Sequence, residues 1–214
     1  MKNIYLNLGT NEGRDLEKFV NSSRYSNDFE IYCFEANHML IENIENIIQK
    51  YNIKNAKIIN KAAWTKKGIL KLYLGRGKPP HIHKAGASIK GGSEASSIMS
   101  DKISGYLSKD VYTNCETLDI SNWILKNFSK EDNIIFTCDI EGAEYDIIDK
   151  MKYDGSLDYL NEIWIEFHGK KLKNFNMVRE FQMVEMLKEK FGSDAFIHKY
   201  HQHNIFEKHH HGEV

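Results

Sequence analysis

The sequence predicts an α/β fold, a three-layer sandwich in which helices cover both faces of a mostly parallel sheet. Three largely apolar runs carry this prediction, each followed by a glycine turn or by polar residues: Ile4–Leu8, Phe29–Phe34 and Ile134–Cys138. A continuous apolar run is typical of a parallel strand that is buried on both faces. Apolar residues at helical spacing follow each run, so strand and helix alternate along the chain.

Length and composition fit one domain. The chain contains two prolines and no linker-like segment, so we expect residues 1–214 to form a single domain with a long inserted loop at about 75–105. Twenty-nine basic residues against thirty acidic ones give a formal charge of -1, which argues against nucleic acid as a partner. No window reaches eighteen apolar residues, so we expect no membrane span and a cytoplasmic protein. Cys33, Cys115 and Cys138 lie in apolar segments without C-x-x-C spacing, which predicts reduced core thiols.

The first strand runs into a glycine turn, Gly9-Thr10-Asn11-Glu12-Gly13, and a helix follows. Gly9 can adopt backbone angles closed to other residues, and Gly13 lets the start of the helix approach a ligand closely. The G-x-x-x-G spacing matches neither the dinucleotide fingerprint nor the P-loop. The absence of the dinucleotide fingerprint argues against a nicotinamide-dependent oxidoreductase.

The second strand ends at Glu35, and an amphipathic helix begins near Asn37. In nucleoside-binding βαβ units, an acid at this position accepts hydrogen bonds from ribose hydroxyls. The alternative is that Glu35 caps the helix. We favour the ribose role.

The middle of the chain is predicted to hold a third parallel strand at Ala56–Trp64 and an added strand at Ile69–Leu74. Ala62 and Ala63 leave room for a flat ring at the sheet edge, although simple close packing explains them as well. From Gly75 to Gly105 the composition shifts to glycine, serine, lysine and histidine, which is typical of a functional lid or a disordered segment.

The second half is predicted to complete a seven-stranded sheet and to end in an antiparallel hairpin. The expected strands are Val111–Cys115, Ile134–Cys138, Glu162–Gly169, Ala195–Tyr200 and Asn204–Glu207, and the expected helices run from Thr117 through Phe128, from Ala143 through Met151 and over Met177–Phe191.

Polar groups follow the central and next strands. Asp139 comes directly after the central strand, at the edge where ligands bind in open α/β sheets, and we favour a functional role over helix capping. For Glu141 and Glu144 both interpretations remain open, since acids are stabilised near helix N-termini. Glu166 and His168 lie two residues apart and therefore face the same side of their strand.

Several motifs together resemble the FkbM family of methyltransferases over roughly Ile4 to Phe206. They occur in the family's order: N-L-G-T-N-E-G, F-E-A-N, K-A-A-W, C-E-T-L-D, C-D-I-E-G-A-E and I-E-F-H-G. The resemblance implies a class I, Rossmann-like fold that binds S-adenosylmethionine and methylates a hydroxyl, often on a sugar or glycan. Asn7 stands where an acid is commoner in the family.

The resemblance also implies roles for individual residues. The methionine part of S-adenosylmethionine would be held by the turn, Glu35 would bind ribose, and small residues would flank adenine. The residues expected around the cofactor are Asn7, Leu8, Gly9, Thr10, Asn11, Gly13, Glu35, Ala36, Asn37, Ala62, Ala63 and Asp139. The methyl group would point towards a crevice bounded by Asp139 and His168.

A sugar hydroxyl is a poor nucleophile at neutral pH, so a base or a cation must stabilise the developing alkoxide. We rank His168 first as a general base. As an alternative, Asp139, Glu166 and His168 hold Mg²⁺ or Mn²⁺. A third interpretation makes Glu166 and His168 a structural pair only. Competing functions are a catalytically silent nucleotide- or carbohydrate-binding relative and a methyltransferase for another small molecule or for nucleic acid.

Overall fold

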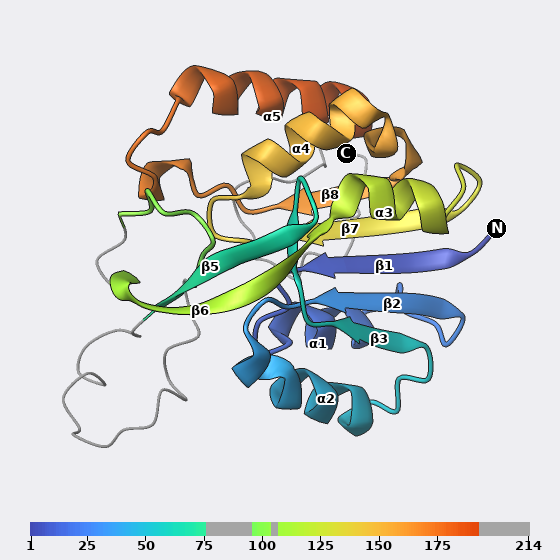
Figure 1. The fold of residues 1–214 in the computed structure, drawn as a ribbon. Coiled ribbons are helices and arrows are strands. Elements are labelled where there is room, and N and C mark those ends of the chain that lie inside the picture. Colours follow the sequence, from blue (N-terminus) through green and yellow to red (C-terminus); the bar gives the residue numbers. More distant parts are fainter. Residues whose placement is uncertain (76–95, 104–106, 193–214) are drawn as a thin grey trace, which may run out of the picture.

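The computed structural model describes residues 1–75, 96–103 and 107–192. Five parallel strands form its main sheet, in the order β3-β2-β1-β7-β8 (Figure 1). These strands are β1 (Asn3–Leu8), β2 (Phe29–Phe34), β3 (Ala56–Ile59), β7 (Asn133–Cys138) and β8 (Glu162–Ile165). The order reverses between β1 and β7, the position at which open α/β sheets bind their ligands.

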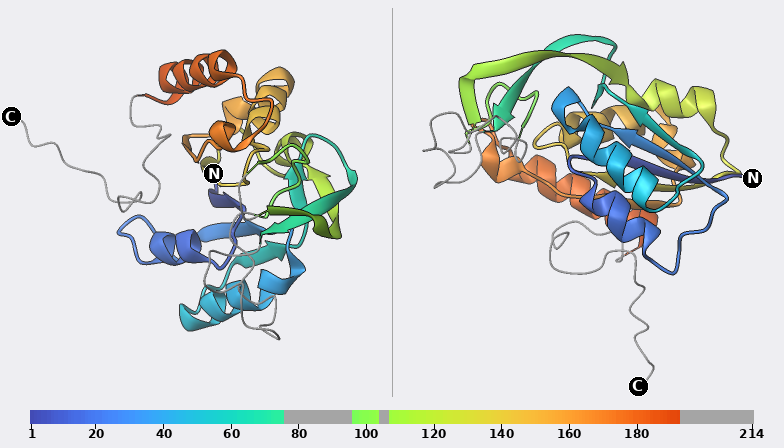
Figure 2. Two further views of the ribbon diagram at one scale, coloured as in Figure 1. Left: turned by 90° about the vertical axis from the view of Figure 1, so that its left-hand side faces the viewer. Right: turned by 90° about the horizontal axis from the view of Figure 1, so that it is seen from below.

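Helices cover both faces of this sheet (Figure 2). They are α1 (Arg14–Val20), α2 (Ile41–Lys50), α3 (Ile120–Asn127), α4 (Glu144–Asp154) and α5 (Met177–Phe191). Alternate strand residues point to opposite faces: Leu6 packs with α3 and α4, whereas Tyr5 packs with α1 and α2. Helix α5 packs beside α4, next to the edge strand β8 (Figure 1). The predicted three-layer arrangement is therefore confirmed.

The predicted seven-stranded sheet is wrong for the described residues, whose parallel sheet has five strands. A separate three-stranded sheet holds β4 (Ala62–Trp64), β6 (Leu107–Asp119) and β5 (Gly68–Gly75) in that order, with β5 antiparallel to β6. The chain leaves the main sheet in a tight turn, in which the backbone N–H of Lys61 donates to the carbonyl of Ile59. The expected third strand is thus split between two sheets.

Strand β6 is longer than predicted, because Thr117 and Leu118 continue it instead of opening a helix. Asp119 ends the strand and caps α3 by accepting a hydrogen bond from the backbone N–H of Asn122. Helix α5 has the predicted bounds. The expected C-terminal hairpin lies outside the described residues.

The three cysteines lie in the core. Cys33, Cys115 and Cys138 are buried free thiols, as predicted. Among the helices that the structure describes, none is long and apolar enough to cross a membrane.

Candidate cofactor and catalytic site

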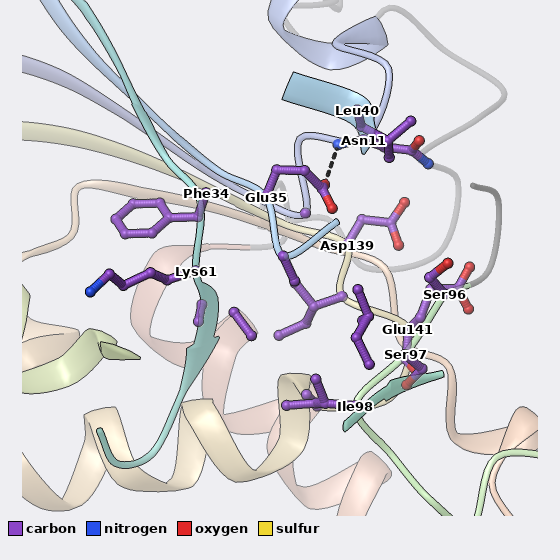
Figure 3. A pocket seen from close by; sticks show the side chains of 17 residues that line it. Asn11, Phe34, Glu35, Leu40, Lys61, Ser96, Ser97, Ile98, Asp139 and Glu141 are labelled. Atoms are coloured by element: carbon purple, nitrogen blue, oxygen red, sulfur yellow. Dashed lines mark hydrogen bonds between the residues drawn. The ribbon is translucent and has the colours of Figure 1, made fainter. Parts of the chain in front are cut away.

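A cavity lies at the carboxyl ends of β1, β2 and β7, where β4 and β5 meet the main sheet (Figure 3). Seven residues predicted to surround a cofactor line it: Gly9, Asn11, Glu35, Ala36, Ala62, Ala63 and Asp139. They come from the glycine turn, the end of β2, the start of β4 and the end of β7. The topology therefore gathers residues as far apart in the sequence as Gly9 and Asp139 at one site.

The glycine turn is shaped by backbone conformation. Gly9 has a φ of 78°, and a Cβ atom there would lie 1.9 Å from the carbonyl oxygen of Asp139. Asn11 also has a positive φ, 53°, which is uncommon for a residue other than glycine. Its side-chain Oδ1 is buried and accepts no hydrogen bond from any described residue. An unsatisfied buried acceptor on a cavity wall is a candidate ligand contact.

Glu35 joins the turn to the second strand. One carboxylate oxygen accepts from the backbone N–H of Asn11 at 2.7 Å (Figure 3), and the other accepts from the backbone N–H of Asn37, also at 2.7 Å. Burial raises the pKa of Glu35, although these backbone donors oppose the shift. The bond to Asn37, which itself caps the following 3₁₀ turn, belongs to the capping interpretation. The ribose role stays a prediction.

The other predicted cofactor residues, Asn7, Leu8, Thr10, Gly13 and Asn37, are not among the described residues that line the cavity. Asn7 points to the α1 and α2 side of the sheet, where its Nδ2 donates to the hydroxyl of Tyr5. Thr10 donates its hydroxyl to the carbonyl of Asn7, and Gly13 caps α1. Thr10 and Gly13 therefore contribute to the conformation of the turn without lining the cavity.

Four carboxylates surround the ring of His168. Oε1 of Glu144 lies 2.8 Å from Nδ1, and on the opposite side Nε2 lies 3.2 Å from Glu166, 3.6 Å from Asp139 and 3.6 Å from Glu141. Glu166 and His168 contact each other, but both follow β8, which ends at Ile165, so the predicted strand Glu162–Gly169 is too long. Asp139 and Glu141 line the cavity, whereas His168 is buried behind them.

The electrostatics of this cluster follow from burial and mutual charge. Burial lowers the pKa of His168, but Glu144 and Glu166 outweigh that effect and raise it to about 10. Burial raises the pKa of Asp139 to about 8, against the opposing charge of His168. An imidazolium has no free lone pair, so His168 in this state stabilises negative charge and does not accept a proton.

Two further residues complete the site: Glu144, whose role the sequence leaves open, and Lys102, which the sequence does not single out. Glu144 is fully buried and accepts hydrogen bonds from the backbone N–H groups of Gly142 and His168. Its place in the D-x-E-G-x-E motif was the only available signal. Lys102 is buried as well, and its ammonium lies 2.7 Å from Glu141. It comes from the Gly75–Gly105 segment, whose lysines the sequence alone does not distinguish.

Residues 96–103, which belong to the Gly75–Gly105 segment, pack against the site. Ser97 pairs with Tyr73 of β5 and donates its hydroxyl to the carbonyl of Glu141 at 2.7 Å. Ser96, Ser97 and Ile98 line the cavity. The rest of the predicted lid, residues 76–95 and 104–105, lies outside the described residues.

Comparisons with known proteins address the fold. No protein-family model and no curated protein matches the chain. The chain is similar to the crystal structure of methyltransferase FkbM from Methylobacillus flagellatus KT, with a TM-score of 0.50 and 10% sequence identity. The similarity covers 86% of this chain and 37% of that one, so this chain spans well under half the length of its structural neighbour. The chain therefore has a methyltransferase-like fold.

Proposed function

We propose that this protein is an S-adenosylmethionine-dependent O-methyltransferase, acting on a hydroxyl of a sugar or glycan. One observation carries the proposal: a single cavity combines the glycine turn, the acid at the end of β2 and Asp139 at the end of β7. The methyltransferase-like fold and the motif resemblance point to the same chemistry.

The residues present fit this cofactor. The buried, unsatisfied Oδ1 of Asn11 is an acceptor for the ammonium group of the methionine part, and Gly9, which lines the cavity, puts no side chain between the turn and the cofactor. Glu35 would accept from ribose hydroxyls in addition to its two backbone donors. Ala36, Ala62 and Leu72 offer small or apolar surfaces to adenine.

When bound, S-adenosylmethionine supplies a methyl group on a cationic sulfonium. The protein's task is then to place the acceptor hydroxyl in line with that group, since positioning lowers much of the barrier of such a displacement. Of the three predicted catalytic residues, Asp139 is the one that lines the described cavity, so we place it against the hydroxyl. His168 contacts both Asp139 and Glu166 without lining the cavity itself. Its positive charge favours a developing alkoxide.

Calorimetry with S-adenosylhomocysteine tests the cofactor assignment. Glu35→Ala should weaken binding roughly tenfold or more, because a hydrogen bond to a charged group contributes about 1.5 to 3 kcal/mol. Glu12→Ala is the matched control, since Glu12 lies on the same turn but pairs with Arg14. Binding of NAD without any response to S-adenosylhomocysteine would refute the assignment.

A further inference from the structure

The imidazole of His168 is held in one orientation. Glu144 contacts both its backbone nitrogen and its ring Nδ1 at 2.8 Å. The other ring nitrogen, Nε2, therefore points towards Glu166 at 3.2 Å and towards Asp139 and Glu141 at 3.6 Å each. A carboxylate behind a histidine is the arrangement that fixes the ring of a metal-binding histidine and leaves its other nitrogen available to the ion.

Three potential ligand atoms converge in front of this ring. One atom each from Asp139, Glu141 and His168 can be chosen so that all lie within 4.8 Å of one another. Oδ1 of Asp139 is buried and, within the part of the chain that the structure describes, accepts no hydrogen bond. Its described neighbour is Nε2 of His168, which at 3.6 Å lies beyond hydrogen-bond distance. A buried carboxylate oxygen without a closer cation or donor is a costly arrangement.

The charge of the surroundings is consistent with a divalent ion. Four carboxylates face His168: Asp139, Glu141, Glu144 and Glu166. Two ammonium groups, those of Lys102 and Lys171, lie 2.7 and 3.1 Å from Glu141. A cation that binds Nε2 takes the place of the proton that His168 carries in its absence; with the imidazole then neutral, these described side chains leave two negative charges, which one divalent cation balances.

We propose that Asp139, Glu141 and His168 form a binding site for a hard divalent cation, Mg²⁺ or Mn²⁺. Carboxylate oxygens with one imidazole nitrogen form a ligand set that suits these ions. In this ligand set Glu141 replaces Glu166, the ligand predicted from the sequence, and Glu144 orients His168. The cation's part in the reaction rests on the proposed methyl transfer, but its binding does not.

Binding of Mn²⁺ to the full-length, EDTA-treated protein tests the site. Calorimetry and electron paramagnetic resonance should show one bound Mn²⁺ per chain, displaced by excess Mg²⁺. Asp139→Asn, Glu141→Gln and His168→Ala should each abolish that binding. Glu144→Gln should weaken it about 10- to 100-fold, as expected for a carboxylate that orients a ligand histidine.

Two controls separate this site from other binding. Asp146→Asn removes a carboxylate of α4 that pairs with Arg179, and it should leave Mn²⁺ binding intact. A variant with alanine in place of the histidines at 201, 203 and 209–211 should also retain it. Circular dichroism tests whether each variant is folded. Glu141→Asp keeps the negative charge and should therefore bind Mn²⁺ measurably, whereas Glu141→Gln should not.

Absence of Mn²⁺ binding by the wild-type protein, or loss of binding in Glu166→Gln with retention in Glu141→Gln, would refute the assigned ligand set. S-adenosylhomocysteine binding measured on the same samples separates the two proposals. Cofactor binding without Mn²⁺ leaves methyl transfer standing, and Mn²⁺ binding without cofactor leaves the cation site standing.

Discussion

Oε1 of Glu144 lies 2.8 Å from both the backbone nitrogen and the ring Nδ1 of His168. Glu144 opens α4, while His168 follows β8, so this contact ties the helix after one strand end to the next strand end. It also decides which ring nitrogen faces the cavity side. The orientation of His168 is therefore set by Glu144, for which the sequence allows both helix capping and a functional role.

Replacing Glu144 with glutamine should release the ring of His168. The amide would set N–H donors against the backbone N–H of Gly142 or against His168 itself, so the ring loses its fixed acceptor. We expect turnover to fall about 10- to 100-fold with the fold retained. Two-dimensional ¹⁵N–¹H spectra of the imidazole ring, followed over pH, should show that the pKa of His168 falls, because Glu144 is one of the groups that raise it. Glu185→Gln, at a surface carboxylate, is the control; an unchanged ring spectrum in Glu144→Gln would contradict the positioning role.

The close approach at Gly9 should make this position intolerant of any side chain. A Cβ atom there would lie 1.9 Å from the carbonyl oxygen of Asp139, so Gly9→Ala must displace the turn or the end of β7. Gly155 has a similar positive φ of 83°, but no described atom lies within 4 Å of its Cβ position. Gly155→Ala therefore carries only the conformational cost, about 1 to 2 kcal/mol.

Urea denaturation of the two alanine variants separates these effects. We expect Gly9→Ala to lower the unfolding free energy by at least about 2 kcal/mol more than Gly155→Ala does, since a backbone clash adds to the cost of the left-handed conformation. It should also weaken S-adenosylhomocysteine binding. Equal losses of stability in both variants would show that the turn can move away from Asp139 freely.

The strand ends were predictable from the sequence because buried parallel strands leave continuous apolar runs. Asp139 and Glu35 stand where such runs stop, and both lie beside the cavity. The split of Ala56–Trp64 into two strands was not predictable. The turn between them contains no glycine or proline, and it is held by a distant contact in which Asn60 Nδ2 donates to the carbonyl of Glu35 at 2.7 Å.

The pairing of Lys102 with Glu141 shows the same limit of local patterns. The two residues are 39 positions apart, and Lys102 lies in a segment whose composition is typical of solvated loops. Only the return of residues 96–103 between β5 and residues 171–173 buries its ammonium group. Local spacing carries no information about that contact.

Asp132 gives a pH-dependent test of the fold. Its carboxylate accepts from the backbone N–H of Ser129 at 2.9 Å and from that of Lys2 at 2.8 Å, and these bonds lower its pKa. A lowered carboxyl pKa stabilises the fold above the pKa of the unfolded chain, about 3.9, and this contribution is lost as pH falls through the folded value. Asp132→Ala should therefore reduce the unfolding free energy at pH 7 by about 1 to 3 kcal/mol.

The same variant should be nearly as stable as the wild-type protein at the lowest pH at which both remain folded. Urea denaturation from pH 7 downwards measures the difference, and Glu45→Ala, at an exposed position of α2, serves as control. A loss of stability that does not change with pH would mean that the hydrogen bonds of Asp132 contribute nothing through its charge.

The last prediction concerns how the acceptor hydroxyl is activated. With tritiated S-adenosylmethionine and a panel of methyl glycosides as acceptors, Asp139→Asn should lower turnover by about 10² to 10⁴ through loss of the group that faces the hydroxyl. Asp146→Asn, the matched control on α4, should retain full turnover.

If a cation completes the site, EDTA should abolish turnover, Mn²⁺ should restore it, and His168→Ala should lose as much as Asp139→Asn. If Asp139 acts without a cation, EDTA should have little effect and His168→Ala should lose less. Full turnover of both Asp139→Asn and His168→Ala would exclude the cluster around His168 from the reaction, because no proton acceptor or cation ligand of that cluster would then be required.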